Sequence, residues 1–278
     1  TPSRSNPATP GSISSVIALR SRKRTEPGNS PLVCHNLVKT LIISDIHANA
    51  TALQVVLEDA GAIDRVWCLG DVVGYGPEPN ECVQILQSLP NLTCLLGNHD
   101  AAVMGFIDLW AFNNEARRAL EVQMRLLNEE SRQFLELLKP KDVQDGVTLA
   151  HGSPRDPIWE YVMSAKVAER NFSAFETQIC LIGHSHIPVI FVENGRRSLQ
   201  VLMPSSGDMW RSEQRFILNP GSVGQPRDRD PRAAYVLWDS EENTWTYHRI
   251  TYDVDRVQKE ILALGIPPIH AMRLAYGM

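Results

Sequence analysis

The sequence lacks several features that would assign a protein to a broad class at once. No apolar stretch approaches the roughly 20 residues that a membrane-spanning helix needs, so we expect a soluble protein with no membrane partner. Its five cysteines form no C-x-x-C pair and no zinc-finger spacing, which argues against a disulfide framework and a structural zinc site. Cys68, Cys94 and Cys180 lie inside apolar runs. This usage is typical of a reducing compartment, and we expect a cytoplasmic location.

Basic charge is scarce beyond residue 33. The first 33 residues carry five of the 27 basic residues and one of the 32 acidic residues, so the remainder holds 22 basic residues against 31 acidic ones. Non-specific nucleic-acid binding requires a basic face, and the acidic remainder argues against it.

The N-terminal 36 residues differ in composition from the rest of the chain. They are rich in Ser, Pro and Arg and contain one acid, Glu26. We expect residues 1–36 to be a disordered extension and residues 37–278 to form the folded domain. The Arg- and Ser-rich composition also fits an organelle transit peptide, so targeting by this segment stays open as an alternative.

Five short apolar runs share one feature, because each ends in Asp, Asn or His. They are LIISDIH (41–47), VWCLGD (66–71), CLLGNHD (94–100), VTLAHG (147–152) and CLIGHSH (180–186). Such runs of Val, Ile, Leu and Cys predict buried strands of an α/β sheet. In open α/β sheets the ligand crevice lies beyond the carboxyl ends of the strands. We therefore expect the five polar ends to converge on one place.

The order of the predicted elements indicates the fold. Segments of helical period separate and follow the runs, at 49–60, 78–89, 112–127, 130–138 and 164–175. This alternation predicts a mainly parallel layer up to residue 186. Consecutive strands are then expected at 189–194, 198–203, 215–222 and 233–250, the last a hairpin, before a closing helix at 254–265. The fold class is therefore predicted to be α/β, a four-layer α-β-β-α sandwich with two mixed central sheets.

The polar ends collect residues that bind metals or transfer protons: Asp45, His47, Asp71, Asn98, His99, Asp100, His151, His184 and His186. A mixture of carboxylate, imidazole and amide suits divalent ions such as Mn²⁺, Fe²⁺, Zn²⁺ or Ni²⁺ better than Ca²⁺. Seven ligands are too many for one tetrahedral ion, so we expect two ions. A carboxylate would bridge them, and a bridging water would become hydroxide near neutral pH and attack phosphorus in line.

These motifs resemble those of the calcineurin-like metallophosphoesterase superfamily. The resemblance rests on D-x-H at 45–47, GD at 70–71, GNHD at 97–100, H at 151 and GHSH at 183–186, in that order. Further stretches, including LGDVVGYGPEPNECV and NPGSVGQPRDRDPRAAY, are similar to the compact bacterial-type members. Ser185 and Ala48 depart from the residues common in the family, and neither departure removes a ligand.

The resemblance implies a role for each polar residue. One ion would be held by Asp45, His47, Asp71 and His186, and the second by Asn98, His151 and His184, with Asp71 bridging. His99 would bind the substrate and protonate the leaving oxygen, and Asp100 would steady the His99 imidazole. A histidine that is adjacent to a ligand and is not itself needed as one is well placed for general acid catalysis.

Outside the ligand set the sequence predicts less. Arg155 and Arg227 are candidates for binding substrate phosphate through bidentate hydrogen bonds. The long segment from Met104 to Pro140 is expected to cover one side of the site and to influence substrate choice. Asn49 is expected to cap the helix that follows it.

The resemblance implies a metal-dependent phosphatase or phosphodiesterase, and Mn²⁺ is the metal chosen for assays. Two alternatives stay open. One is a metal-free scaffold on the same fold, which should have lost ligands, and the other is a nuclease, which should have a basic groove. The sequence separates neither monoester from diester hydrolysis nor one oligomeric state from another.

Overall fold

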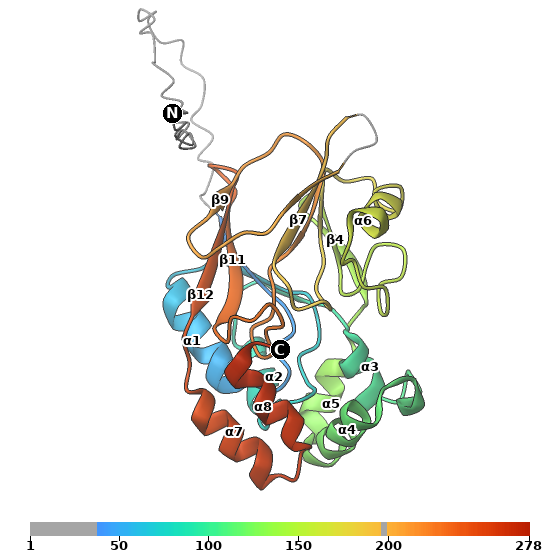
Figure 1. Ribbon diagram of the computed structural model, residues 1–278, viewed down its shortest axis with the longest axis vertical. Helices are drawn as coiled ribbons and strands as arrows, with labels where there is room; N and C mark the ends of the chain where they lie inside the picture. The colour runs from blue at the N-terminus through green and yellow to red at the C-terminus, as the bar shows by residue number, and fades with distance from the viewer. Residues whose placement is uncertain (1–37, 196–198) are drawn as a thin grey trace, which may run out of the picture. The chain divides into compact units, whose positions relative to one another are not determined.

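The computed structural model describes residues 38–195 and 199–278, and the predicted extension at 1–36 lies outside these ranges. Within them the strands form two six-stranded sheets (Figure 1). A search of the same residues finds no helix long and apolar enough to cross a bilayer.

The first sheet joins parallel strands from the start of the domain to an antiparallel hairpin from its end. Its order is β3 (Leu92–Cys94), β2 (Arg65–Cys68), β1 (Lys39–Ile43), β11 (Ala233–Asp239), β12 (Thr244–Ile250) and β9 (Met209–Trp210). Asp239 pairs with Thr244 across the turn, which confirms the predicted hairpin.

The second sheet contains the other two apolar runs. Its order is β4 (Lys141–Gln144), β5 (Val147–Ala150), β6 (Ile179–Leu181), β10 (Phe216–Asn219), β7 (Val189–Glu193) and β8 (Leu199–Leu202). Strands β5, β6 and β10 are parallel, and the remaining pairs are antiparallel. The expectation of one mainly parallel layer up to residue 186 was therefore wrong. A strand that is buried on both faces has the same sequence pattern in either sheet, so the pattern could not separate the two.

The two sheets lie face to face over an apolar core. Ile42 and Trp67 of the first sheet and Phe216 of the second belong to the cluster between them. The neighbours Leu41 and Ile43 of β1 belong instead to a second cluster with the helices outside the first sheet, because successive side chains of a strand point to opposite faces. This second cluster includes side chains of α1 (Ala50–Ala60), α2 (Pro79–Gln87), α4 (Asn114–Leu126) and α5 (Glu129–Glu136).

A third cluster lies on the outer face of the second sheet, where α6 (Ala165–Asn171) packs. Figure 1 shows α1 and α6 on opposite outer sides of the pair of sheets. The predicted four-layer α-β-β-α sandwich is thus confirmed. Asn49 also caps α1 as expected, since its side-chain oxygen accepts a hydrogen bond from the Ala52 backbone.

The structure differs from the expectations in three respects. The helix at 254–265 is α7 (Val254–Ala263), and it does not close the chain, because α8 (Pro268–Tyr276) follows it. Gly265, with φ of 70°, ends one helix, and Pro268 in the first turn begins the next. The edge strands β4 and β9 were not expected, since β4 is only partly buried with little apolar pattern and β9 has only two residues.

The third difference concerns the GNHD motif. Its polar residues begin α3 (Asn98–Val103) and do not end a strand. The Asp100 carboxylate accepts a hydrogen bond from the Gly97 backbone N–H at 3.0 Å, as in a capping box, and this starts the helix directly after the loop. The 3₁₀ turn η1 (Leu109–Ala111) lies between α3 and α4.

Candidate metal centre

The loops that hold the predicted ligands have an unusual backbone. Five of these residues adopt a left-handed conformation, with φ values of 55° at Asp45, 50° at His47, 52° at Asp71, 63° at His184 and 61° at His186. Positive φ is uncommon outside glycine, although Asp and His adopt it more readily than most residues. Such strain persists where the surrounding structure enforces it, and it concentrates at functional sites.

Hydrogen bonds between the loops enforce this backbone. The Asp45 N–H donates to Gly70 O at 3.0 Å, and the His47 N–H donates to Asp71 O at 2.9 Å. The Asp45 carboxylate also accepts from the His184 N–H at 3.1 Å, which joins loops from the two sheets.

Position 97 requires glycine because there is no space for a side chain. Its backbone φ of −88° would suit any residue. A Cβ atom added there would, however, lie 2.0 Å from Asp71 Oδ1. The absence of a side chain at position 97 therefore allows the Asp71 carboxylate to take its place in the site.

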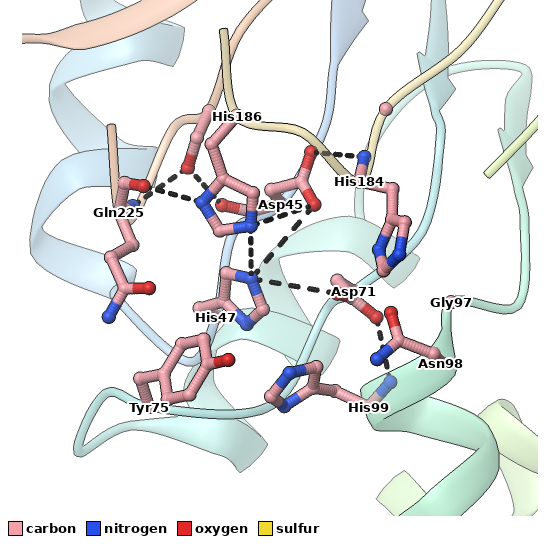
Figure 2. A network of polar contacts seen from close by, with 12 residues as sticks. Asp45, His47, Asp71, Tyr75, Gly97, Asn98, His99, His184, His186 and Gln225 are labelled. Atoms are coloured by element: carbon pink, nitrogen blue, oxygen red, sulfur yellow. Dashed lines mark hydrogen bonds and ion pairs between the residues drawn. The ribbon is translucent and has the colours of Figure 1, made fainter. Parts of the chain in front are cut away.

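One group of candidate ligands contains Asp45, His47, Asp71 and His186 (Figure 2). His47 Nδ1 lies 3.2 Å from Val73 O, and His186 Nδ1 lies 2.5 Å from Gln225 O. A carbonyl can only accept, so both Nδ1 atoms carry the proton and a neutral ring has its lone pair at Nε2. The two Nε2 atoms face each other at 3.1 Å.

This arrangement fits a cation. Two facing lone pairs repel, but two nitrogens bound to one ion at roughly 2.0–2.1 Å lie about 3 Å apart. Asp45 Oδ1 lies 3.4 Å from His186 Nε2, and this buried oxygen has no hydrogen-bond partner among the described residues. The first group thus provides unpaired acceptors that all face the same point.

A second group contains Asp71, His151 and His184. His151 Nδ1 contacts Leu69 O at 2.9 Å, and its Nε2 faces Asp71 Oδ2 at 3.4 Å and Asn98 Oδ1 at 3.1 Å. In each group the potential ligand atoms lie within 4.8 Å of one another. Asp71 belongs to both groups, and its Oδ2 lies 3.6 Å from His47 Nε2 of the first.

The structure therefore brings all seven predicted ligands together, from loops of both sheets. The sequence motifs and this geometry agree with a family match. The family model of the calcineurin-like phosphoesterase superfamily domain matches residues 38–243. The chain belongs to the calcineurin-like phosphoesterase superfamily. Family membership, together with the Asp and His clusters, supports a metal-binding hydrolase.

Two of the relatives cover most of the length of this chain. An uncharacterized protein of Methanocaldococcus jannaschii is 34% identical over 253 residues, which is 87% of this chain and 100% of that relative. The crystal structure of a metallophosphoesterase from Sphaerobacter thermophilus is 40% identical and covers 87% of this chain and 100% of its own, with a TM-score of 0.80.

Other relatives share a part of the chain or the fold. A symmetrical bis(5′-nucleosyl)-tetraphosphatase of Pseudomonas putida is 31% identical over 132 residues, 43% of each protein. A hypothetical protein of Pyrococcus horikoshii covers 87% of this chain and 99% of its own with a TM-score of 0.72, and at 20% identity it shows the fold alone.

Burial sets the charge of most imidazoles at this site. It lowers the pKa of His47, His184 and His186 well below the usual value, so these rings are neutral and suited to bind a metal. His151 differs. Burial disfavours its charged form as well, but the Asp71 and Asp45 carboxylates and the Leu69 carbonyl together outweigh burial and raise the pKa of His151 to about 9. A cation at this site would take the place of that proton.

His99 lies next to the metal groups without belonging to them. Its backbone N–H donates to Asp71 Oδ1 at 2.9 Å, and its ring contacts the edges of Tyr75 and Phe112 with centroids 4.5 Å and 5.2 Å away. Burial lowers the pKa of His99 to about 4. Its Nδ1 is buried without a hydrogen-bond partner among the described residues.

Asp100 does not take the place expected for it. Among residues 38–195 and 199–278 no hydrogen bond joins Asp100 to the ring of His99. The Asp100 carboxylate accepts instead from the backbone N–H groups of Val72, Val73 and Gly97 at 3.0 to 3.2 Å. The helix start at Asn98 turns Asp100 back toward these amides, so Asp100 supports the loop that carries Asp71.

The two predicted arginines have different surroundings. Arg155 is 40% exposed and forms an ion pair with Glu160 at 3.4 Å, and no contact to the metal groups is found in the described part of the chain. Arg227 donates to Gln225 Oε1 at 2.9 Å and to the Tyr75 hydroxyl at 3.4 Å. Its charge also lowers the pKa of several histidines of the site.

Three residues near the site were not predicted. Tyr75 is 7% exposed and contacts both His47 and His99. Tyr161 stacks on His184 with ring centroids 3.8 Å apart. Gln225 acts through its backbone carbonyl, which every residue possesses, so its contribution left no signal in the sequence.

Proposed function

We propose that this protein hydrolyses phosphate monoesters, diesters or both at two divalent metal ions. Asp45, His47, Asp71 and His186 would hold one ion, and Asn98, His151 and His184 would hold the other together with Asp71. The ions would lower the pKa of a bound water and neutralise charge on the phosphate oxygens.

One observation carries this proposal. Asp71 is the member common to both groups, and its carboxylate lies between imidazoles of the two. A single carboxylate shared in this way is what two ions a few ångströms apart require. Because these carboxylates are buried, their negative charges need positive charge nearby, and two cations would supply more of it than the single proton that His151 can carry.

Arg227 would orient the substrate. It lies beside Tyr75 and Gln225 at the site, and its guanidinium Nε is buried without a hydrogen-bond partner among the described residues. A guanidinium can donate two parallel hydrogen bonds to phosphate oxygens. We therefore assign phosphate binding to Arg227 and not to Arg155, which is paired with Glu160.

His99 would assist the leaving group. As an attacking water oxygen forms its bond to phosphorus, the bond from phosphorus to the ester oxygen breaks and negative charge develops on that oxygen. The negative charge of a bound phosphate would favour the protonated ring, and His99 as an imidazolium would donate its proton to the departing oxygen and become neutral. Solvent would then return a proton to the ring.

The test uses purified chain loaded with Mn²⁺ and a panel of p-nitrophenyl phosphate, bis(p-nitrophenyl) phosphate, nucleotides and phosphopeptides. We expect hydrolysis of at least one ester, and elemental analysis should find close to two ions per chain. The variant His248→Ala is the matched control, since His248 stacks on Tyr235 outside the ligand groups. Absence of turnover with all esters at full metal loading would refute the proposal.

The same experiment addresses the two alternatives. A metal-free scaffold would contain well under one ion per chain after purification without chelator. A nuclease would cleave single- or double-stranded DNA faster than small esters. The complete set of ligands favours the enzyme over the scaffold.

A further inference from the structure

Two aromatic side chains from separate segments form a short row that begins at His99, since the first packs on His99 and the second packs on the first. Phe112, between η1 and α4, packs with its ring at 75° to that of His99 and with centroids 5.2 Å apart. Trp159, from the loop between β5 and α6, packs on Phe112 with centroids 5.1 Å apart. The two rings thus extend outward from the proposed proton donor.

Both segments are held in place locally. The side chain of Asn113, next to Phe112, accepts a hydrogen bond from Ala116 N–H and so caps α4. The backbone N–H of Trp159 donates to Asp156 Oδ1 at 3.1 Å. The Trp159 loop also approaches Gly152 so closely that a Cβ there would lie 3.1 Å from Trp159 N. The aromatic pair therefore belongs to anchored loops.

The pair is also partly accessible, unlike other rings around His99. Phe112 and Trp159 are half-buried, whereas Tyr75 on another side of His99 is only 7% exposed. Covering exposed apolar surface with a ligand is favourable, because it removes that surface from water. Aromatic rings prefer another planar ring as that ligand.

From this arrangement we propose that Phe112 and Trp159 form a binding subsite for a planar aromatic ring on the leaving group of the ester. The inference rests on the proposed function, because the leaving oxygen must lie beside His99 to receive its proton. Whatever is attached to that oxygen can then lie beside Phe112, which is the partly exposed aromatic ring in contact with His99. The ring could belong to a simple aryl ester or to a nucleoside.

The test measures binding apart from turnover. Calorimetry on Mn²⁺-loaded protein compares phenylphosphonate with methylphosphonate, which are not hydrolysed and differ only in the ring. A second pair, AMP and ribose 5-phosphate, is compared by inhibition of chromogenic ester hydrolysis and distinguishes a nucleoside from a simple aryl group. We expect the aromatic member of at least one pair to bind about tenfold more tightly, since base–aromatic stacking contributes of this order.

Variants assign the preference to the two rings. Phe112→Leu and Trp159→Leu retain apolar volume but remove the ring, and should reduce the preference to within about twofold while methylphosphonate binding stays unchanged. Trp110→Ala is the matched control, because Trp110 is an aromatic residue of the same segment that is 76% exposed and lies over Arg117. It should leave the preference intact.

Two results would overturn the subsite. One is wild-type protein in which neither pair shows a difference beyond twofold, including the case in which no member binds. The other is a preference that persists in both leucine variants. Failure of the proposed function is a separate outcome, since it removes chromogenic turnover and leaves the calorimetric comparison of the phosphonates in place.

Discussion

Adjacent residues of the GNHD motif have different surroundings, and the first turn of α3 explains why. Asn98 faces His151, whereas the His99 ring lies among aromatic side chains and Asp100 turns back to the backbone. Successive residues of a helix point about 100° apart, so one short segment can serve a metal, a proton transfer and a loop at once.

Replacing His99 tests the assignment of proton donor. His99→Ala should lower turnover of esters with poor leaving groups by about 100-fold or more, because general acid catalysis contributes about that much. Esters with a p-nitrophenolate leaving group should be affected less. Metal content, measured by elemental analysis, should match that of wild type and of His248→Ala. A parallel loss of metal would make His99 a ligand.

Replacing Asp71 tests the shared carboxylate. Asp71→Asn keeps the shape but removes the negative charge, and both groups contain this residue. We expect fewer bound ions at both positions, seen as a fall from close to two ions per chain toward none. Retention of one full equivalent would assign Asp71 to a single ion only.

Two observations led to the seven predicted ligands. Each of them follows an apolar run, and the resemblance to the family separated them from His99 and Asp100, which follow the same run as Asn98. Tyr75 and Tyr161 follow no such run, and Gln225 contributes a backbone atom, so their places depend on tertiary contacts alone. The partner of Asp100 was mispredicted for the same reason, because it is a set of backbone amides.

At the scale of elements, the strands with strong apolar runs were predictable and the weakly patterned ones were not. Strand β1 is buried on both faces, since Leu41 and Ile42 belong to different clusters, and its sequence is continuously apolar. Strand β4 is half-exposed, and α8 has an apolar side that its short length hides. Both depend on neighbours that a local pattern does not reveal.

The join between β3 and α3 provides a prediction at this scale. Gly97→Ala would place a Cβ 2.0 Å from Asp71 Oδ1, so the loop or the carboxylate must move. We expect a loss of about 1–3 kcal/mol in the free energy of unfolding and fewer bound ions. The measurements are denaturant unfolding and elemental analysis.

Gly61→Ala serves as the control for this variant. Gly61 ends α1 with φ of 66° and has nothing within 4 Å of an added Cβ. The Gly61→Ala variant should lower the free energy of unfolding through backbone strain and leave metal content unchanged. Normal metal content in Gly97→Ala would show that the site tolerates the added atom.

At the scale of the whole molecule, the predicted ligands of each group come from both sheets. Asp45 and Asp71 follow strands of the first sheet, and His184 and His186 follow β6 of the second. The sequence predicted that the polar ends converge but not that they do so across two sheets. That division depends on which strands pair, and pairing is a property of the complete fold.

Removing the metal tests this arrangement. A ligand that binds only the folded state stabilises it by about 2.7 kcal/mol at 100 times its dissociation constant. For a domain of this size we expect saturating Mn²⁺ to raise the melting temperature by about 5–10 °C over chelated protein. Calorimetry checks this, and Asp71→Asn should lose most of the shift. An equal melting temperature with and without Mn²⁺ would contradict binding to the folded state.

Because each group of predicted ligands comes from both sheets, the affinity for ions should depend on how tightly the two sheets pack against each other. Trp67 and Trp245 are buried in the cluster between the sheets, and neither is a predicted ligand. Replacing either tryptophan by a smaller residue would weaken the packing between the sheets. The first effect would be loss of bound metal, although no predicted ligand had been changed.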